Sequence, residues 1–214
     1  MGCIGVGALA TAGSVGCAAE PSSNSSKDHR EQEDETSSSS TAQQGSSSAP
    51  QEEPISSDRA TAVVLFSCSV KTEAVADKVA QAADGGLVRI EAAEPYTAQD
   101  LDYGSDRRAN SEQENGSARP ALASPVPDIA EWGTVYLGYP IWWGEAPRVI
   151  LTILEGVDAT GKRIIPFCTS GSSPISGSID ELHAAALEAE WGEGRRFASN
   201  ASRQEIDTWM EEAR

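Results

Sequence analysis

Two short segments of the chain combine residue types that suit an anion and a flat ring. The first places hydroxyls and one lysine just before a predicted helix: Ser67, Cys68, Ser69, Val70, Lys71 and Thr72. Free N–H groups and the dipole at a helix N-terminus favour phosphate, although Ser and Thr before a helix are also ordinary caps. The second segment contains adjacent tryptophans bounded by Pro and Gly: Pro140, Ile141, Trp142, Trp143 and Gly144. We expect at least one tryptophan to line a pocket or cover a planar ligand, the alternative being that one only caps the core.

A third segment is small and polar, and consists of Thr169, Ser170, Gly171 and Ser172. Gly171 would let the backbone approach a ligand closely. By itself the segment fits any strand-to-helix turn. The first segment also lacks the glycine patterns of nucleotide- and dinucleotide-binding loops, so no segment alone defines a site.

The hydrophobic pattern predicts that all three segments follow strands of a single parallel sheet. Apolar, β-branched runs indicate strands at 62–66, 87–90, 134–138 and 163–167, with a short edge strand at 195–197. Helices are predicted at 72–84 and 147–154, and two more from the capping boxes Ser178-x-x-Glu181 and Ser202-x-x-Glu205. This alternation predicts an α/β fold, a doubly wound five-stranded parallel sheet with helices on both faces. Ligands of such sheets bind beyond the carboxyl ends of the strands, where the three segments would meet.

Composition divides the 214 residues into three parts. Residues 1–17 resemble a bacterial lipoprotein signal, with Cys17 as the residue to be acylated; an unstructured N-terminus with an incidental cysteine is the alternative. Residues 18–59 are Ser-rich and acidic, and predict a disordered tether. Residues 60–214 contain every aromatic residue and form the predicted domain. We therefore expect an exported bacterial protein, anchored at the outer face of the cytoplasmic membrane only through lipid on Cys17.

Charge and rare residues exclude several classes of function. The chain carries 33 acids against 16 bases, for a net charge of −17, which disfavours nucleic-acid binding. Its two histidines and four cysteines lack the spacing of a metal site or a Ser-His-Asp triad, so we expect no metal. Cys68 and Cys168 follow non-adjacent strands, and are expected to be buried small residues rather than a disulfide.

The second and third segments, with their flanking residues, resemble the flavodoxin-like proteins, particularly a short flavodoxin-fold group of anaerobic bacteria. The similarity is most specific at LGYPIWWG (137–144) and PFCTSGS (166–172). In the first segment Phe66, Ser67, Ser69 and Thr72 fit the family's phosphate loop, F-S-x-T-G-x-T. Val70 stands where that loop usually has Gly. A positive φ at this position would therefore strain the loop and weaken cofactor binding.

The resemblance implies that the cofactor is FMN, which supplies the redox chemistry. Ser67, Ser69 and Thr72 would hold its phosphate, and residues 141–143 would flank the ring. The Gly144 backbone would lie near the flavin N5, and residues 169–172 would hydrogen-bond the pyrimidine side or the ribityl chain. The acidic domain disfavours added negative charge on the flavin, which predicts a low potential and a basic partner. A long insertion at 96–128 could lie over the flavin through Asn110, Glu112, Gln113 and Arg119.

The sequence leaves the activity of such a protein open. The leading hypothesis is electron transfer with a redox partner protein or a small acceptor such as a quinone. A nicotinamide-dependent flavin or quinone reductase is the second hypothesis, because small reductases bind nicotinamide without a linear motif. A binding module that kept the fold and lost the flavin is the third. Phosphate-ester recognition without redox chemistry would leave Trp142 and Trp143 unexplained.

Overall fold

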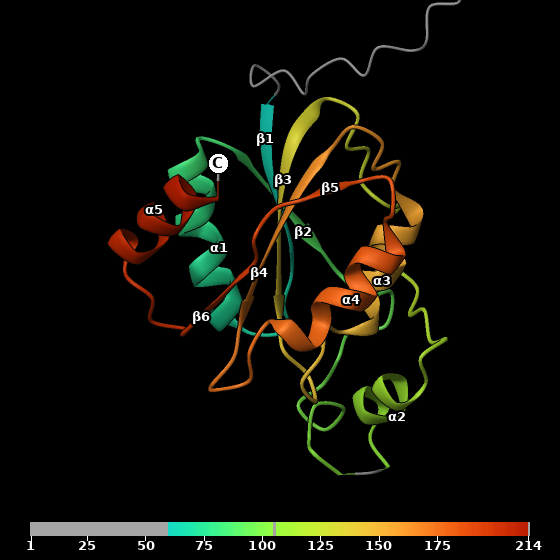
Figure 1. Cartoon of the computed structure of the whole chain (residues 1–214). Coiled ribbons are helices and arrows are strands. Elements are labelled where there is room, and N and C mark those ends of the chain that lie inside the picture. The colour runs from blue at the N-terminus through green and yellow to red at the C-terminus, as the bar shows by residue number, and fades with distance from the viewer. Residues whose placement is uncertain (1–59, 105, 214) are drawn as a thin grey trace, which may run out of the picture. The chain divides into compact units, whose positions relative to one another are not determined.

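The computed structural model describes residues 60–104 and 106–213, and its centre is a parallel sheet (Figure 1). The predicted leader with Cys17 and the predicted tether at 18–59 lie outside the described residues. The strand order is β2-β1-β3-β4-β5, with β6 also pairing with β4, and every pairing is parallel. The strands are β1 (Ala60–Phe66), β2 (Gly86–Ile90), β3 (Trp132–Pro140), β4 (Arg163–Thr169), β5 (Glu190–Trp191) and β6 (Arg195–Phe197). The predicted flavodoxin-like α/β fold is confirmed.

Helices cover both faces of this sheet, as Figure 1 shows. One face carries α1 (Val70–Ala83) and α5 (Arg203–Glu212), which pack over Val63, Leu65 and Phe167. The other face carries α3 (Arg148–Gly156) and α4 (Ser176–Ala185), which pack over Val64, Leu137 and Ile164. Successive apolar residues of the central strands therefore contribute alternately to two cores, and this explains the continuous apolar runs of these strands.

Three features differ from the sequence-based expectation. Helix α4 begins at Ser176, so Ser178 lies inside the helix, fully buried, and the capping box predicted from Ser178 is wrong. Two short strands form the sheet edge next to β4: β5 pairs with the start of β4, and β6 pairs with its end. The insertion contains a short helix, α2 (Arg108–Glu114), which the pattern did not indicate. The second predicted capping box, at Ser202, is present at the start of α5.

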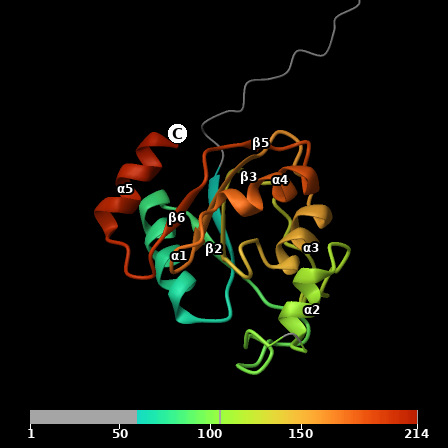
Figure 2. The ribbon, with the colours of Figure 1, turned by 60° about the horizontal axis from the view of Figure 1, so that its bottom comes forward.

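The carboxyl ends of β1, β3 and β4 lie at one edge of the molecule. Figure 2 brings this edge forward, with the three following loops next to one another and α2 beside them. Within the described residues, no helix is both long and apolar enough to span a membrane. The next question is whether the three loops make contact.

Candidate functional site

Thr169, at the end of β4, joins the three predicted segments. Its hydroxyl lies 2.8 Å from the Thr72 hydroxyl, and both side chains are buried. Its carbonyl oxygen accepts a 3.0 Å hydrogen bond from the backbone N–H of Ile141. The hydroxyl-rich loop, the tryptophan loop and the small polar loop therefore converge on one residue, as the sheet topology predicts.

The hydroxyl-rich loop leads into the open N-terminus of α1. The Ser67 hydroxyl donates to the Ser69 carbonyl at 2.5 Å and accepts from the Ser69 N–H at 3.2 Å. Ser69 is the N-cap residue of α1, yet its side chain makes no capping hydrogen bond. The first-turn N–H groups therefore have no acceptor from the N-cap side chain, and the exposed Lys71 adds a positive charge beside them.

Val70 is the first residue of α1, not a turn residue with positive φ. In the described part of the chain, the only non-glycine residues with positive φ are Asp84 and Trp143. The Val70 side chain is 76% exposed and does not pack in the core. The strain that we considered for this position is therefore absent, because the helix begins one residue after Ser69.

The two tryptophans lie in a tight turn and separate there. Trp142 and Glu145 exchange two backbone hydrogen bonds of 2.9 Å, while Trp143 and Gly144 have φ of 50° and 93°. Two consecutive positive φ values indicate a type I′ turn, which costs a bulky residue such as Trp143 about 1–2 kcal/mol. Trp142 packs edge-on against Phe66, whereas Trp143 has a tilted contact with Tyr103. Trp142 therefore caps the core, whereas coverage of a planar ligand by Trp143 stays a prediction.

A polar network around the buried side chains of Gln113 and Arg148 supports this turn. The Gln113 amide donates to the Ala146 carbonyl at 3.1 Å and accepts from the Arg148 N–H at 3.1 Å. The Arg148 side chain is only 4% exposed and forms ion pairs with Glu145 and Glu181 at 3.0 and 2.7 Å. Breaking such a buried pair leaves an uncompensated charge, so the network fixes the turn between α2, α3 and α4.

Helix α4 also constrains the turn through a close backbone approach. A Cβ at Gly177 would lie 2.2 Å from the Gly144 carbonyl oxygen, so only glycine fits at that position. Sequence analysis missed both Gly177 and Arg148. The Glu145 and Arg148 pair at i, i+3 was a usable signal, since it places an arginine in the first turn of an otherwise apolar helix.

The four insertion residues proposed from the sequence take different positions. Gln113 supports the tryptophan turn, and Asn110 donates to Glu114 at 2.9 Å within α2. Arg119 is bound to Glu155 on α3 at 2.6 Å. Glu112 accepts a short hydrogen bond from the Tyr96 hydroxyl.

Tyr96 is an aromatic residue of the site that the sequence did not single out. Its ring lies 4.9 Å from the Trp142 ring and 6.1 Å from the Phe66 ring, edge-on in both cases. The Arg108 guanidinium lies 4.2 Å above it. Burial, and then the Glu112 hydrogen bond, raise the pKa of the Tyr96 hydroxyl, so it remains a neutral phenol.

The small polar loop presents open backbone and hydroxyl groups. The Ser170 hydroxyl donates to the Ser173 carbonyl at 2.5 Å, which closes the turn. Gly171 and Ser172 are exposed, and a Cβ at Gly171 would meet nothing within 4 Å. This loop therefore leaves free space beside the buried Thr169.

Comparison with known proteins assigns the domain. A sequence model described as flavodoxin matches residues 60–213. The chain belongs to the flavodoxin family. The comparison with curated proteins found no match.

Several solved flavoprotein structures resemble this chain. A putative flavoprotein from Bacteroides uniformis is 42% identical, with a TM-score of 0.69 over 72% of this chain and 98% of that one. One from Bacteroides eggerthii is 35% identical, with a TM-score of 0.69 over 73% and 98%. A flavoprotein from Lactobacillus acidophilus, solved in complex with FMN, is 18% identical, with a TM-score of 0.53 over 71% and 99%. This last likeness concerns the fold.

The two cysteines of this flavodoxin-family domain are free thiols. Cys168 is buried as expected, whereas Cys68 is only partly buried. Burial raises the pKa of Cys68 to about 11 and that of Cys168 to about 12. Both thiols therefore stay protonated at neutral pH, a state that disfavours nucleophilic chemistry.

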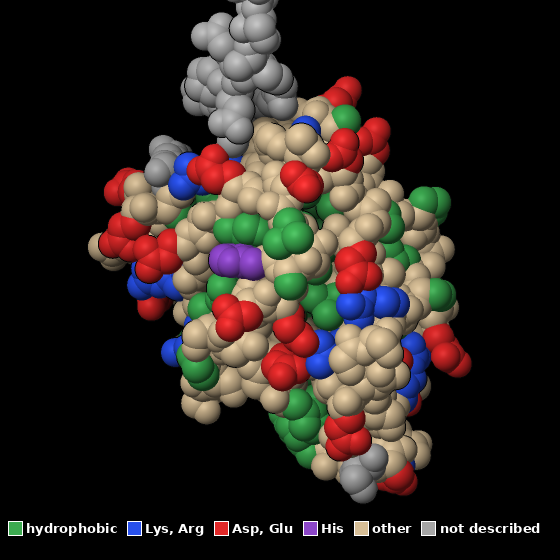
Figure 3. Space-filling model, turned by 45° about the vertical axis from the view of Figure 1, so that its right-hand side comes forward, with side chains coloured by type: hydrophobic (Ala, Val, Ile, Leu, Met, Phe, Trp, Pro, Cys, Tyr) green, Lys and Arg blue, Asp and Glu red, His purple; other side chains and the backbone are tan. Residues whose placement is uncertain are grey.

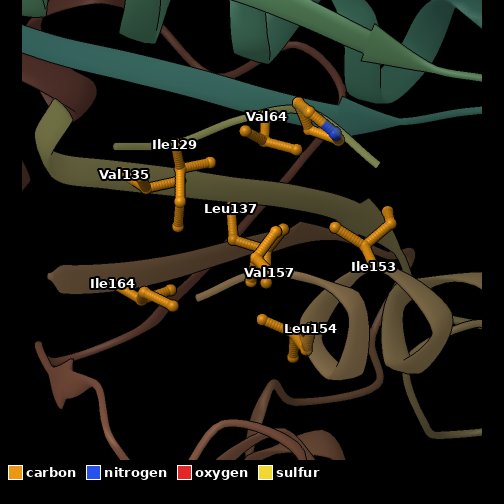
Figure 4. Close-up of a pocket in the computed structure, with 9 residues that line it drawn as sticks. Val64, Ile129, Val135, Leu137, Ile153, Leu154, Val157 and Ile164 are labelled. Atoms are coloured by element: carbon orange, nitrogen blue, oxygen red, sulfur yellow. The ribbon is translucent and has the colours of Figure 1, made fainter. Parts of the chain in front are cut away.

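Two cavities lined by described residues lie away from the three loops. An apolar one between the sheet and α3, lined by residues such as Leu137, Ile153 and Val157, measures about 10 Å³ (Figure 4). That is about the space of one water molecule, and its walls offer no polar partner. A surface groove of about 380 Å³ lies near Ile129 and Lys162, beside the starts of β3 and β4. The candidate site is therefore identified by its chemistry and position.

Proposed function

We propose that this chain is an FMN-binding redox protein that acts in electron transfer. The observation that carries the proposal is the convergence of the three loops on Thr169, beside the open N-terminus of α1. Membership of the flavodoxin family and the FMN complex of the Lactobacillus acidophilus flavoprotein support the choice of ligand. Bound FMN would supply the electron-accepting ring.

The phosphate of FMN fits the start of α1. The first-turn N–H groups have no acceptor from the Ser69 side chain, and the hydroxyls of Ser67 and Ser69 lie just before them. Thr72 lies in the first turn of α1, with its hydroxyl buried against Thr169. Lys71 provides a positive charge, while Cys68 and Val70 contribute backbone. These groups would bind a dianion even in an acidic domain, because their effect is local.

The ring of FMN fits the other two loops. Ile141, Trp142 and Trp143 provide apolar and aromatic surface, and Pro140 and Gly144 bound the turn that holds them. Ser170, Gly171 and Ser172 offer backbone and hydroxyl groups to the polar side of the ring. These side chains would position the ring and exclude water from it. The raised pKa values of Cys68 and Cys168 disfavour a thiolate nucleophile at neutral pH, which leaves the redox chemistry to the flavin.

Charge supports a basic redox partner or a neutral acceptor such as a quinone. Residues 60–214 carry 24 acids against 13 bases. Figure 3 shows acidic side chains spread across the α3 and α4 side of the molecule, with fewer basic ones among them. Such a surface attracts basic proteins at low ionic strength.

The first experiment mixes the purified full chain with FMN and follows it through a desalting column. We expect flavin to elute with the protein, with quenched fluorescence, and riboflavin, which lacks the phosphate, to be retained far less. Passage of all FMN into the small-molecule fraction would refute the proposal and favour a flavin-free binding module. Addition of NADH or NADPH to the complex then tests the second hypothesis, since rapid bleaching indicates a reductase.

We also propose that the domain is held at a membrane surface through lipid on Cys17. The apolar stretch before Cys17 and the polar run after it support this proposal. Expression of the full chain and of Cys17→Ser in a bacterium, followed by fractionation, tests it. Membrane association of the wild type alone supports the tether, and identical fractionation of both proteins contradicts it.

A further inference from the structure

Among the arginines that the structure describes, one forms no ion pair with a carboxylate. Nine arginines lie in the described residues, and eight of them form ion pairs with carboxylates: Arg89, Arg107, Arg108, Arg119, Arg148, Arg163, Arg195 and Arg203. Within this part of the chain Arg196 makes no ion pair, and its guanidinium donates one hydrogen bond to a carbonyl oxygen. In a domain with 24 acids and 13 bases, an arginine without a carboxylate is unexpected.

Arg196 lies at the candidate site. Its guanidinium nitrogen is 3.1 Å from the carbonyl oxygen of Ser170, in the small polar loop. The side chain is half-buried, and a guanidinium has five N–H donors, so most of its hydrogen-bonding capacity is available. A partly desolvated positive charge with spare donors is suited to a negative charge on a ligand.

The sheet register places the Arg196 side chain on the face of the sheet opposite the start of α1, which follows the hydroxyl-rich loop. Arg196 pairs with Cys168, whose side chain lies in the core under α3 and α4. The next pair, Thr169 with Phe197, points to the α1 face, where Thr169 contacts Thr72. Side chains alternate along strands, so Arg196 and the open start of α1 are on opposite faces.

We propose that Arg196 supplies the positive charge that stabilises reduced FMN at its pyrimidine side, and this inference rests on the proposed function. Two electrons from a reduced partner protein, or from dithionite in the test, together with one proton convert oxidised FMN to its reduced anion. The negative charge of that anion is shared over the pyrimidine ring, and no bond to the protein forms or breaks. The positive charge of Arg196 thus locally offsets the negative electrostatic potential of the acidic domain.

The test compares three variants of the full chain. Arg196→Gln removes the charge, and Arg196→Lys keeps it. Arg195→Gln is the matched control, because Arg195 is the preceding residue of β6, and its side chain pairs with Glu212 and lies over Phe197. For each protein we would measure the Kd of oxidised FMN by fluorescence and the midpoint potential by reductive titration, and calculate the Kd of reduced FMN from the two.

We expect Arg196→Gln to bind oxidised FMN within about twofold of wild type and reduced FMN about tenfold more weakly. For a two-electron couple, tenfold corresponds to a potential about 30 mV lower. Arg196→Lys should recover most of this difference, and Arg195→Gln should match wild type. Circular dichroism checks that each variant is folded, and Arg196→Lys keeps the test decisive should Arg196→Gln not fold.

Two results would overturn the inference and leave the proposed function intact. The first is an equal ratio of oxidised to reduced affinity in wild type and Arg196→Gln. The second is weaker binding of oxidised FMN with unchanged riboflavin binding, which would make Arg196 a phosphate ligand. Failure of the wild type itself to retain FMN would overturn both proposals, and is distinguished by the absence of flavin from every variant.

Discussion

Helices α1 and α5 pack side by side on one face of the sheet, and both have serine at the N-cap, yet they begin differently (Figure 1). At α5, Ser202 accepts from the Glu205 N–H at 3.2 Å, and Glu205 accepts from the Ser202 N–H at 2.8 Å. At α1, the Ser69 side chain makes no capping hydrogen bond. The start of α5 is satisfied by its own side chains, and the start of α1 is open to a ligand.

The N-termini of α1 and α5 also differ in the residues that surround them. The α1 start is tied through Thr72 to Thr169 and from there to the tryptophan loop. The start of α5 follows Ala201, whose carbonyl oxygen accepts a 2.6 Å hydrogen bond from Lys78 of α1. This contact helps α5 to pack against α1. The same residue type at a helix start therefore caps the helix at α5 and leaves the first-turn N–H groups without a side-chain acceptor at α1.

Ser69→Asp should give the largest effect, because it fills the open start with a carboxylate. We expect FMN affinity to fall about 100-fold, equivalent to about 2.8 kcal/mol, through repulsion of the phosphate. Stability should stay equal or rise, since Asp is a favourable N-cap beside the helix dipole. Fluorescence titration and urea denaturation measure the two quantities. Unchanged FMN affinity would mean that the phosphate binds elsewhere.

Ser202→Ala should give the opposite pattern at α5. Loss of the cap is expected to lower the free energy of unfolding by about 1 kcal/mol and the Tm by about 2–4 °C. FMN affinity should stay within about twofold of wild type, because the site is independent of this helix start. Thermal denaturation and the same titration provide the check, and a large loss of FMN affinity would contradict the separation of the two starts.

The α5 cap should depend on pH. Hydrogen bonds from the Ser202 backbone and side chain hold the pKa of Glu205 below its ordinary value. Its contribution to stability is therefore present above the ordinary Glu pKa, and is lost as the pH falls through the lower pKa of the folded state. The stability difference between wild type and Glu205→Ala should shrink on acidification from neutral pH. Urea denaturation at several pH values measures it, and a constant difference would argue against the ionised cap.

Val70→Gly should give the smallest effect. Val70 is helical and exposed, so the family's usual glycine gains no relief of strain. We expect FMN affinity within about threefold of wild type and stability lower by less than about 0.5 kcal/mol. An increase in affinity of tenfold or more would show that Val70 had limited binding.

Much of the fold and part of the site could be predicted from sequence. Continuous apolar runs specify buried parallel strands, and topology then brings the loops after β1, β3 and β4 to one edge. The capping box at Ser202 could be predicted because its two residues, Ser202 and Glu205, lie within four positions of each other. The box at Ser178 was misread, because the same pattern occurs inside α4, where Ser178 is buried.

The sequence by itself determined the resemblance to the flavodoxin family, the alternation of strands and helices, and the three loops that follow strands, because local periodicity and short motifs encode them. The tertiary structure decided which residues support those loops. Gln113 and Arg148 meet across 35 positions, Thr72 and Thr169 across 97, and Arg196 and Ser170 across 26. Such contacts depend on distances between elements, and no short stretch of sequence contains them.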